Sequence, residues 1–345
     1  MCSKSKTIVY LILGCIAFSA FAQNKYRLEV EPLDFQSDDQ FITPMISEIE
    51  FNGEHLVIQS ASLPEFYQIS LTGQLLSKHG RLGEGPGEFS GAPRGLGAFD
   101  HRICVIGKNG KRASFYQDGT FVKQFYLESY LYFSGNYASN AVAFVGNKVI
   151  VPCRRTSGAL ALAYDLDDPE KKQKVGRPLD FDKKILWQKR YLNDTMWTGD
   201  GRHAFAAFDY FPLILHFDES LNLVRQYNLD SPHFVNTFED ILEFERIPGK
   251  STHPMPLIQD FQVTPSFFYL LSRTSLFRLA RTSGAVVDVF HFYGVGDTFE
   301  SLAGKNLVFE YMAVINDQKL ILGHTAMPWG HDLWQVTLPL GMKLN

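Results

Sequence analysis

Long apolar segments, catalytic signature motifs and a marked excess of charge are all missing from this 345-residue sequence. Beyond residue 22, no stretch approaches the roughly 18 apolar residues that cross a bilayer. The formal net charge of -4 gives no electrostatic case for a nucleic-acid partner. The sequence contains no Gly-x-Ser-x-Gly elbow, His-Glu-x-x-His helix or Walker loop. These absences argue against an enzyme, although a site assembled from distant loops would carry none of the motifs.

Cysteine is also scarce, with four residues in the chain, two of them within the first 15 positions. Cys104 and Cys153 would remain after export, in a compartment where a disulfide could form. Cys104 falls early in its predicted strand, whereas Cys153 ends the equivalent strand one repeat later. An offset of about four residues at roughly 3.3 Å each exceeds the Cα separation that a bridge allows. We therefore predict two free, partly buried thiols.

The first 22 residues have the order of a secretory signal peptide. Two lysines precede an apolar stretch over residues 8–21, and Ala-Phe-Ala at residues 20–22 follows the pattern of a cleavage site. We predict cleavage after Ala22 and a periplasmic or secreted mature protein. Removing two lysines and no acid changes the formal charge from -4 to -6. A lipobox-like segment at residues 11–15 leaves a lipoprotein anchored through Cys15 as the alternative, which the apolar residues after Cys15 disfavour.

A short polar turn followed by a β-prone run recurs six times along the chain. The copies read FNGEHLVIQ from Phe51, FDHRICVIG from Phe99, FVGNKVIVP from Phe144, GDGRHAFAA from Gly199, VTPSFFYLL from Val263 and INDQKLILG from Ile315. Successive copies start 45 to 64 residues apart, about the length of one four-stranded propeller blade with a variable loop. We therefore predict an all-β fold, a single six-bladed β-propeller domain of four-stranded antiparallel blades over residues 23–345.

Strand signals within the repeats predict the same order of elements in each blade. A strand, a tight turn and a second strand are followed by a loop, a third strand, a turn and a fourth strand. In the second repeat the predicted strands are 96–99, 103–106, 112–116 and 121–127, the last two joined by a hairpin turn. The last repeat lacks its outermost strand, because the chain ends soon after residues 331–338. Residues 26–35 alternate like a strand but have no hairpin partner. Pairing of these two segments would close the ring, and deleting residues 26–35 should destabilise the protein far more than loss of a tail.

Residues 231–256 form an insertion between the fourth and fifth repeats. Thr-Phe-Glu-Asp at residues 237–240 can cap a short helix with its apolar residues on one side. The predicted helix is flanked by Ser231-Pro232 and by Ile247-Pro248-Gly249, so it should stop sharply. Either a packed surface decoration or a lid over the channel mouth would fit this pattern.

The segment HGRLGEGPGEF at residues 79–89, followed by APRGL at residues 92–96, resembles the blade-to-blade junction of NHL-repeat propellers. It is still more similar to exported six-bladed propellers of Bacteroidetes that are grouped with TolB-like propellers. The resemblance implies a ring of six blades with a binding role. Some six-bladed propellers are calcium-dependent lactonases or lyases, whose metal-binding residues do not map onto this chain by a motif. The glycines of residues 83–87 do not indicate a dinucleotide loop, because such a loop needs a preceding buried strand and a following helix, whereas Pro86 and Glu88 suit an extended turn.

Equivalent positions at the ends of the second strands should meet at the loop-rich face, around one mouth of the channel. The set is basic in an acidic protein, and its cations could converge on a carboxylate or a sulfate. The predicted ligand-binding residues are Arg94, Lys108, Arg154, Arg155, Tyr210, Arg273, His324 and Trp329. Trp329 suits stacking on a sugar or an aromatic ligand. The alternatives are solvated loop tips and a packed tryptophan.

Four acidic residues, Glu48, Asp194, Asp260 and Glu310, stand near the starts of the first strands, which should line the channel. Carboxylates arranged around an axis could hold Ca²⁺ through oxygen ligands. They could equally pair with Arg94 and with water in the channel.

These observations predict an exported monomeric binding protein that needs no cofactor. It would recognise a small molecule, a glycan fragment or an envelope protein at the loop-rich face. The alternative is a calcium-dependent hydrolase or lyase that uses the channel carboxylates. A scaffold in an envelope complex is a third hypothesis, and nucleic acid is not an expected partner.

Overall fold

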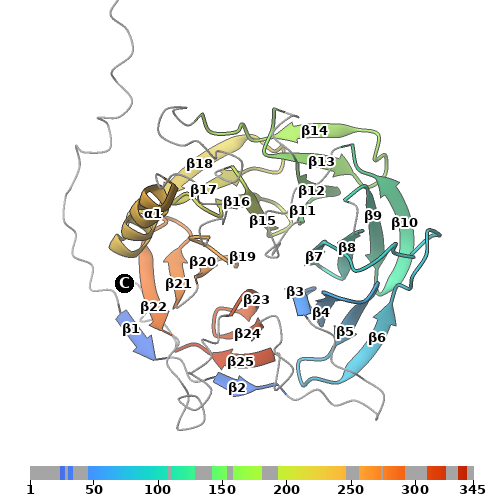
Figure 1. Cartoon of the computed structure of the whole chain (residues 1–345), viewed down its shortest axis with the longest axis horizontal. Coiled ribbons are helices and arrows are strands. Elements are labelled where there is room, and N and C mark those ends of the chain that lie inside the picture. The colour runs from blue at the N-terminus through green and yellow to red at the C-terminus, as the bar shows by residue number, and fades with distance from the viewer. Residues whose placement is uncertain are drawn as a thin grey trace, which may run out of the picture.

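The computed structural model describes residues 24–27, 30–33, 46–107, 110–128, 142–153, 158–180, 193–245, 256–272, 275–291, 309–323 and 333–339. They form six small sheets that surround a central axis like the blades of a fan, with one helix on the rim (Figure 1). Within each blade, sequence neighbours pair antiparallel, in order from the axis outward. The predicted six-bladed β-propeller is therefore confirmed. The predicted signal peptide lies outside the described residues.

The first three blades each contain four strands that are consecutive among the described residues. The first contains β3 (Ile46–Phe51), β4 (Leu56–Ser60), β5 (Phe66–Ile69) and β6 (Leu75–His79). The second contains β7 (Gly95–Phe99), β8 (Arg102–Ile106), β9 (Arg112–Gln117) and β10 (Thr120–Tyr126). The third contains β11 (Ala143–Val145), β12 (Lys148–Pro152), β13 (Ala161–Asp165) and β14 (Lys172–Val175). In the second blade, the observed strands match the predicted ones within one or two residues.

The last three blades include the helix and both ends of the chain. The fourth contains β15 (Thr195–Gly199), β16 (Ala204–Phe208), β17 (Leu213–Phe217) and β18 (Leu223–Asn228). The fifth contains β19 (Asp260–Val263), β20 (Phe267–Leu271), β21 (Ser275–Ala280) and β22 (Val286–His291). The sixth contains β23 (Tyr311–Asn316), β24 (Lys319–Gly323) and β25 (Leu333–Thr337).

The ring closes through the N-terminal segment, as predicted, but in two pieces. β2 (Val30–Pro32) pairs antiparallel with β25 and supplies the fourth strand of the last blade. β1 (Asn24–Arg27) instead pairs parallel with β22, as a fifth strand on the outer edge of the fifth blade. Leu33 follows β2, donates its backbone N–H to the carbonyl of Leu333 at 3.0 Å and is buried. The predicted single strand over residues 26–35 is thus divided between two blades.

The core of the described ring lies between the blades. One cluster of buried apolar residues fills each of the six joints between neighbouring sheets. A blade that is covered on both faces needs apolar residues on both, which explains why every residue of β4 (LVIQS) and of β16 (AFAAF) is buried. Near the axis the inner strands approach so closely that a Cβ at Gly97 would lie 2.3 Å from the carbonyl oxygen of Val142.

The insertion after the fourth blade contains α1 (Pro232–Glu245), which begins five residues before the predicted cap at residue 237. Pro232 was expected to flank the helix and stop it, but it occupies the first turn of the helix, where its missing N–H costs nothing. Phe234 is fully buried against Phe277 of β21, with ring centroids 4.7 Å apart. Figure 1 places α1 on the rim, beside β22 and away from the centre of the ring. This position favours the interpretation of the insertion as a packed surface decoration rather than as a lid over the channel mouth.

The two thiols predicted to be free are confirmed as free cysteines, Cys104 buried and Cys153 partly buried. Cys104 lies in β8 of the second blade, and Cys153 follows β12 of the third. Burial raises the pKa of the Cys104 thiol to about 12. Cys104 is therefore a packing residue without thiolate reactivity at neutral pH.

Candidate ligand-binding cavity in the central channel

The six first strands end around one mouth of the central channel, and their ends enclose a cavity of about 510 Å³. Five blades contribute the last residues of their inner strand and the turn that follows, whereas the third blade contributes Val142 and the first two residues of β11. The lining residues are Glu50, Phe51, Gly53, Ala98, Phe99, Asp100, Val142, Ala143, Phe144, Thr198, Gly199, Asp200, Gln262, Val263, Thr264, Pro265, Val314, Ile315, Asn316 and Asp317. Because second strands start here and end at the other face, this mouth is opposite to the predicted loop-rich site.

Side chains of the turn residues fix the shape of this mouth. In three blades an Asn or Asp side-chain oxygen accepts two backbone N–H groups from the residues that follow it. The bonds run to Asn52 from Glu54 and His55, to Asp200 from Arg202 and His203, and to Asn316 from Gln318 and Lys319. In the fifth blade, Thr264 Oγ1 accepts the N–H of Phe267 at 3.1 Å. These local bonds hold the turns in one conformation and explain the polar residues in the repeat.

Neighbouring turns are also tied to one another. His101 donates its backbone N–H to the carbonyl of Asn52 at 2.7 Å, and Gly146 donates to the carbonyl of Gly201 at 2.7 Å. The Thr264 hydroxyl of the fifth blade donates to Asp317 of the sixth at 2.5 Å. The mouth is therefore a connected rim, which keeps the cavity open without a ligand.

Asp200 forms the charged part of the wall in the fourth blade. It makes an ion pair with Arg281, whose guanidinium also donates to the carbonyl of Thr264 at 3.1 Å. Burial tends to raise the pKa of Asp200, but the N–H groups of Arg202 and His203 together with Arg281 outweigh it and lower the pKa. Asp200 is therefore ionised, and it links the fourth and fifth blades.

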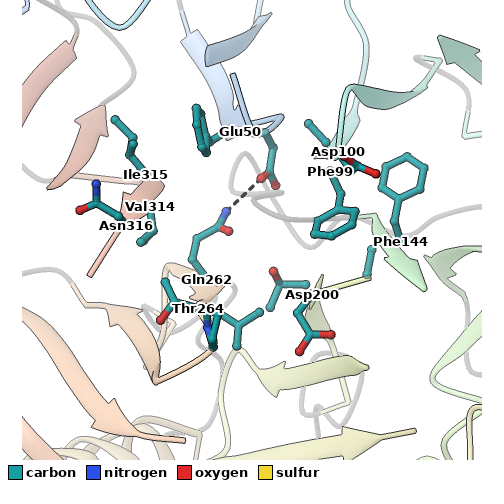
Figure 2. Close-up of a pocket in the computed structure, with 18 of the residues that line it drawn as sticks. Glu50, Phe99, Asp100, Phe144, Asp200, Gln262, Thr264, Val314, Ile315 and Asn316 are labelled. Atoms are coloured by element: carbon teal, nitrogen blue, oxygen red, sulfur yellow. Dashed lines mark hydrogen bonds between the residues drawn. The ribbon is translucent and has the colours of Figure 1, made fainter. Parts of the chain in front are cut away.

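Glu50 lies deeper in the cavity, near the end of β3. Its Oε2 accepts a hydrogen bond from Gln262 Nε2 at 3.1 Å, which joins the first blade to the fifth across the channel (Figure 2). Burial and the neighbouring carboxyl of Asp260 raise the pKa of Glu50 well above 4.5. Burial and Asp260 therefore favour the protonated form of Glu50.

Aromatic rings provide part of the apolar wall. Phe99 and Phe144 flank the guanidinium of Arg102, whose central carbon lies 5.5 Å and 5.1 Å from their ring centroids. The same arginine donates to the carbonyl of Gly146 at 2.7 Å. Figure 2 shows Phe99 on the wall between Glu50 and Asp200. The cavity thus combines carboxyl groups, the amides of Gln262 and Asn316, and apolar side chains.

Most of the predicted loop-face residues, namely Lys108, Arg154, Arg155, Arg273, His324 and Trp329, lie outside the described residues. The described second strands end at or within two residues of the positions predicted for them. Arg94 is exposed just before β7, and its backbone N–H donates to the carbonyl of Ile106 at 2.8 Å. Tyr210 is 4% exposed, within the core cluster between the fourth and fifth blades. The predicted loop-face site stays a prediction.

The four predicted metal ligands do lie at or near the starts of inner strands. Glu48 and Asp260 are completely buried, and Asp194 and Glu310 are partly exposed. Asp260 accepts the backbone N–H groups of Phe261, at 2.5 Å, and of Met312, and so joins the fifth blade to the sixth. Among the residues that the structure describes, no three His, Cys, Asp or Glu side chains are grouped closely enough to hold a metal ion. Calcium binding stays a prediction.

Sequence reasoning missed the acidic residues of the opposite mouth, Asp100, Asp200 and Asp317. Each occupies the polar turn that opens its repeat, and turn formation alone accounts for an Asp at that place. The signal that could have found them is their equivalence, because equivalent positions in a propeller meet around the axis.

Comparison with known proteins supports the fold. No family model matches the chain, and no curated protein matches it. A candidate exported protein of Bacteroides fragilis is similar over 87% of both chains, with 12% identity and a TM-score of 0.54. The Pan2 WD40 domain of Neurospora crassa has 11% identity over 92% of this chain and 96% of its own, with a TM-score of 0.49. At such identities, the likeness to the Bacteroides fragilis protein shows a shared fold and nothing more.

Among the described helices, none has the length and apolar character needed to span a membrane.

Proposed function

We propose that this propeller is a binding protein that takes up a small molecule in the cavity at the turn-side mouth of its channel. The observation that carries the proposal is the cavity itself. Its volume of about 510 Å³ falls within the range of small-molecule sites, about 300–1,000 Å³. Backbone and side-chain bonds between blades hold it open, so a ligand would meet a preformed site.

The cellular setting is part of the same proposal. Residues 1–22 support export followed by cleavage after Ala22, with lipidation at Cys15 as the alternative. The similar Bacteroides fragilis protein is itself named as a candidate exported protein. Kinship with NHL-repeat and TolB-like propellers of Bacteroidetes is supported by the segment of residues 79–89, which links β6 to β7 between two blades. The basic residues predicted at the loop-rich face remain a second candidate site, where they would bind an anionic ligand. A calcium-dependent hydrolase remains the alternative activity.

The test is a fragment screen by thermal shift and ligand-observed NMR, with cationic, anionic and neutral compounds. Pro265→Trp should weaken every cavity ligand at least about tenfold, because the exposed Pro265 lines the mouth and an indole there would obstruct entry. Ser266→Trp is the matched control, since Ser266 is exposed in the same turn but does not line the cavity. The proposal fails if no fragment binds, or if fragments bind Pro265→Trp as tightly as the wild type.

A further inference from the structure

Glu50 has an unused acceptor inside the cavity. The residue is 6% exposed, and Figure 2 shows its carboxyl group pointing into the channel toward Gln262. Gln262 contacts Oε2, whereas Oε1 accepts no hydrogen bond from the residues that the structure describes. An oxygen that faces the cavity without a donor can accept a hydrogen bond from a ligand, so a ligand that brings an N–H group would add an interaction that the described residues do not supply.

The rest of the lining favours a donor with positive charge. Among the described residues that line the cavity, Glu50, Asp100, Asp200 and Asp317 are acidic, and none is basic. Asp200 is engaged by Arg281, and Asp317 accepts hydrogen bonds from the hydroxyls of Thr264 and Tyr269. Asp100 is exposed at the rim, where its charge would attract a cation from solution. An anionic ligand would be repelled from this wall.

We propose that the cavity binds a small organic cation, whose protonated amine, amidine or guanidinium group donates to Glu50 and whose apolar part lies against Phe99. This rests on the proposed function, because it names the ligand class of the same cavity. A planar N–H donor pair matches a carboxylate in bidentate geometry. The Phe99 ring adds an apolar surface that also attracts cations through its π face.

Binding of a cation should be linked to the release of protons. Burial and the carboxyl of Asp260 in β19 favour protonated Glu50. The strands packed against β3 carry few other titratable groups: Tyr311 in β23, Lys319 in β24 and none in β4 or β7, with Glu48 on β3 itself. A cation beside Oε1 favours the carboxylate, so the proton leaves as the ligand enters. Affinity should therefore rise with pH.

The experiment compares benzamidine with benzamide, which have nearly the same shape but differ in charge. Isothermal titration calorimetry on the purified protein should show benzamidine binding at least tenfold more tightly than benzamide. Titrations in buffers of different ionisation enthalpy should show net proton release for benzamidine alone. Glu50→Gln keeps the size of the side chain and should weaken benzamidine at least tenfold, with benzamide little changed. Glu170→Gln, an exposed position on the outer hairpin of the third blade, removes the same charge and should bind benzamidine like the wild type.

The outcomes separate this inference from the proposed function. Equal affinity for the two probes, or no binding of benzamidine, overturns the cationic ligand class even if other fragments bind and are blocked by Pro265→Trp. Undiminished benzamidine binding by Glu50→Gln overturns the role of Glu50. The comparison of the two probes on the wild type needs no variant, so a folding defect in Glu50→Gln would not prevent a decision.

Discussion

Buried carboxyl groups on the inner strands serve two different purposes, one structural and one for ligand binding. Asp260 uses both of its oxygens on backbone N–H groups of two adjacent blades, so its burial helps to hold the ring together. Glu50 has a side-chain amide as its one hydrogen-bonding partner among the described residues. Burial raises the pKa of both groups. The difference in partners is what makes Glu50 a candidate for binding and Asp260 a candidate for structure.

Replacing Glu50 by Gln should stabilise the protein at neutral pH. Because the folded state raises the pKa of Glu50 above 4.5, the folded protein binds more protons than the unfolded chain between the two pKa values. The resulting stability is fully present below about pH 4.5 and is lost as pH rises toward the folded pKa. Glutamine cannot ionise, so the difference in free energy of unfolding between Glu50→Gln and the wild type should be near zero at pH 4 and grow with pH. Each unit of pKa shift corresponds to about 1.4 kcal/mol.

Urea denaturation at half-unit steps from pH 4 to pH 8 measures this difference. Glu170→Gln, exposed on the outer edge of the ring, should show no comparable trend. A Glu50→Gln variant that becomes less stable than the wild type as pH rises would contradict the assignment of a protonated, buried Glu50.

Among the elements, those defined by local turn chemistry were predictable and those defined by distant contacts were not. The strands of the second blade agree with prediction because Asp118 and Gly119, with φ of 49° and 71°, form the tight turn that their sequence indicates. The start of α1 was mispredicted, because Ser231-Pro232 can end one segment or open the next. Phe234, buried on Phe277 of another blade, decides between them, and sequence spacing does not reveal that contact.

Phe234→Ala should therefore cost about 3–5 kcal/mol of stability, since it removes a fully buried ring from the joint between the fourth and fifth blades. Val235→Ala is the control on the same helix, because Val235 is 37% exposed and its loss should change stability by about 0.5 kcal/mol or less. Chemical denaturation of both variants checks the difference. Equal effects would mean that α1 is not anchored through Phe234.

At the scale of the whole molecule, repetition predicted the number of blades but not where a ligand would bind. The repeat spacing reflects a physical unit, because a sheet covered on both faces needs neighbours of the same size. The choice of channel mouth depends on which side chains point toward the axis, and equivalent turns in six blades come together only in the folded ring. The site predicted at the loop-rich face consists mainly of basic residues, whereas the cavity at the opposite mouth has four acidic residues and no basic residue in its lining.

Ring closure gives a test that involves the whole molecule. A protein starting at residue 28 lacks β1, which leaves the fifth blade with four strands, as the first four blades have. A protein starting at residue 34 also lacks β2 and Leu33, so the sixth blade keeps three strands and exposes the edge of β25. The longer deletion should cost at least about 3 kcal/mol more than the shorter, from loss of a buried leucine and an unpaired edge. Thermal melting with light scattering should show an earlier transition and aggregation for the longer deletion alone, and matching behaviour of the two would mean that β2 does not close the ring.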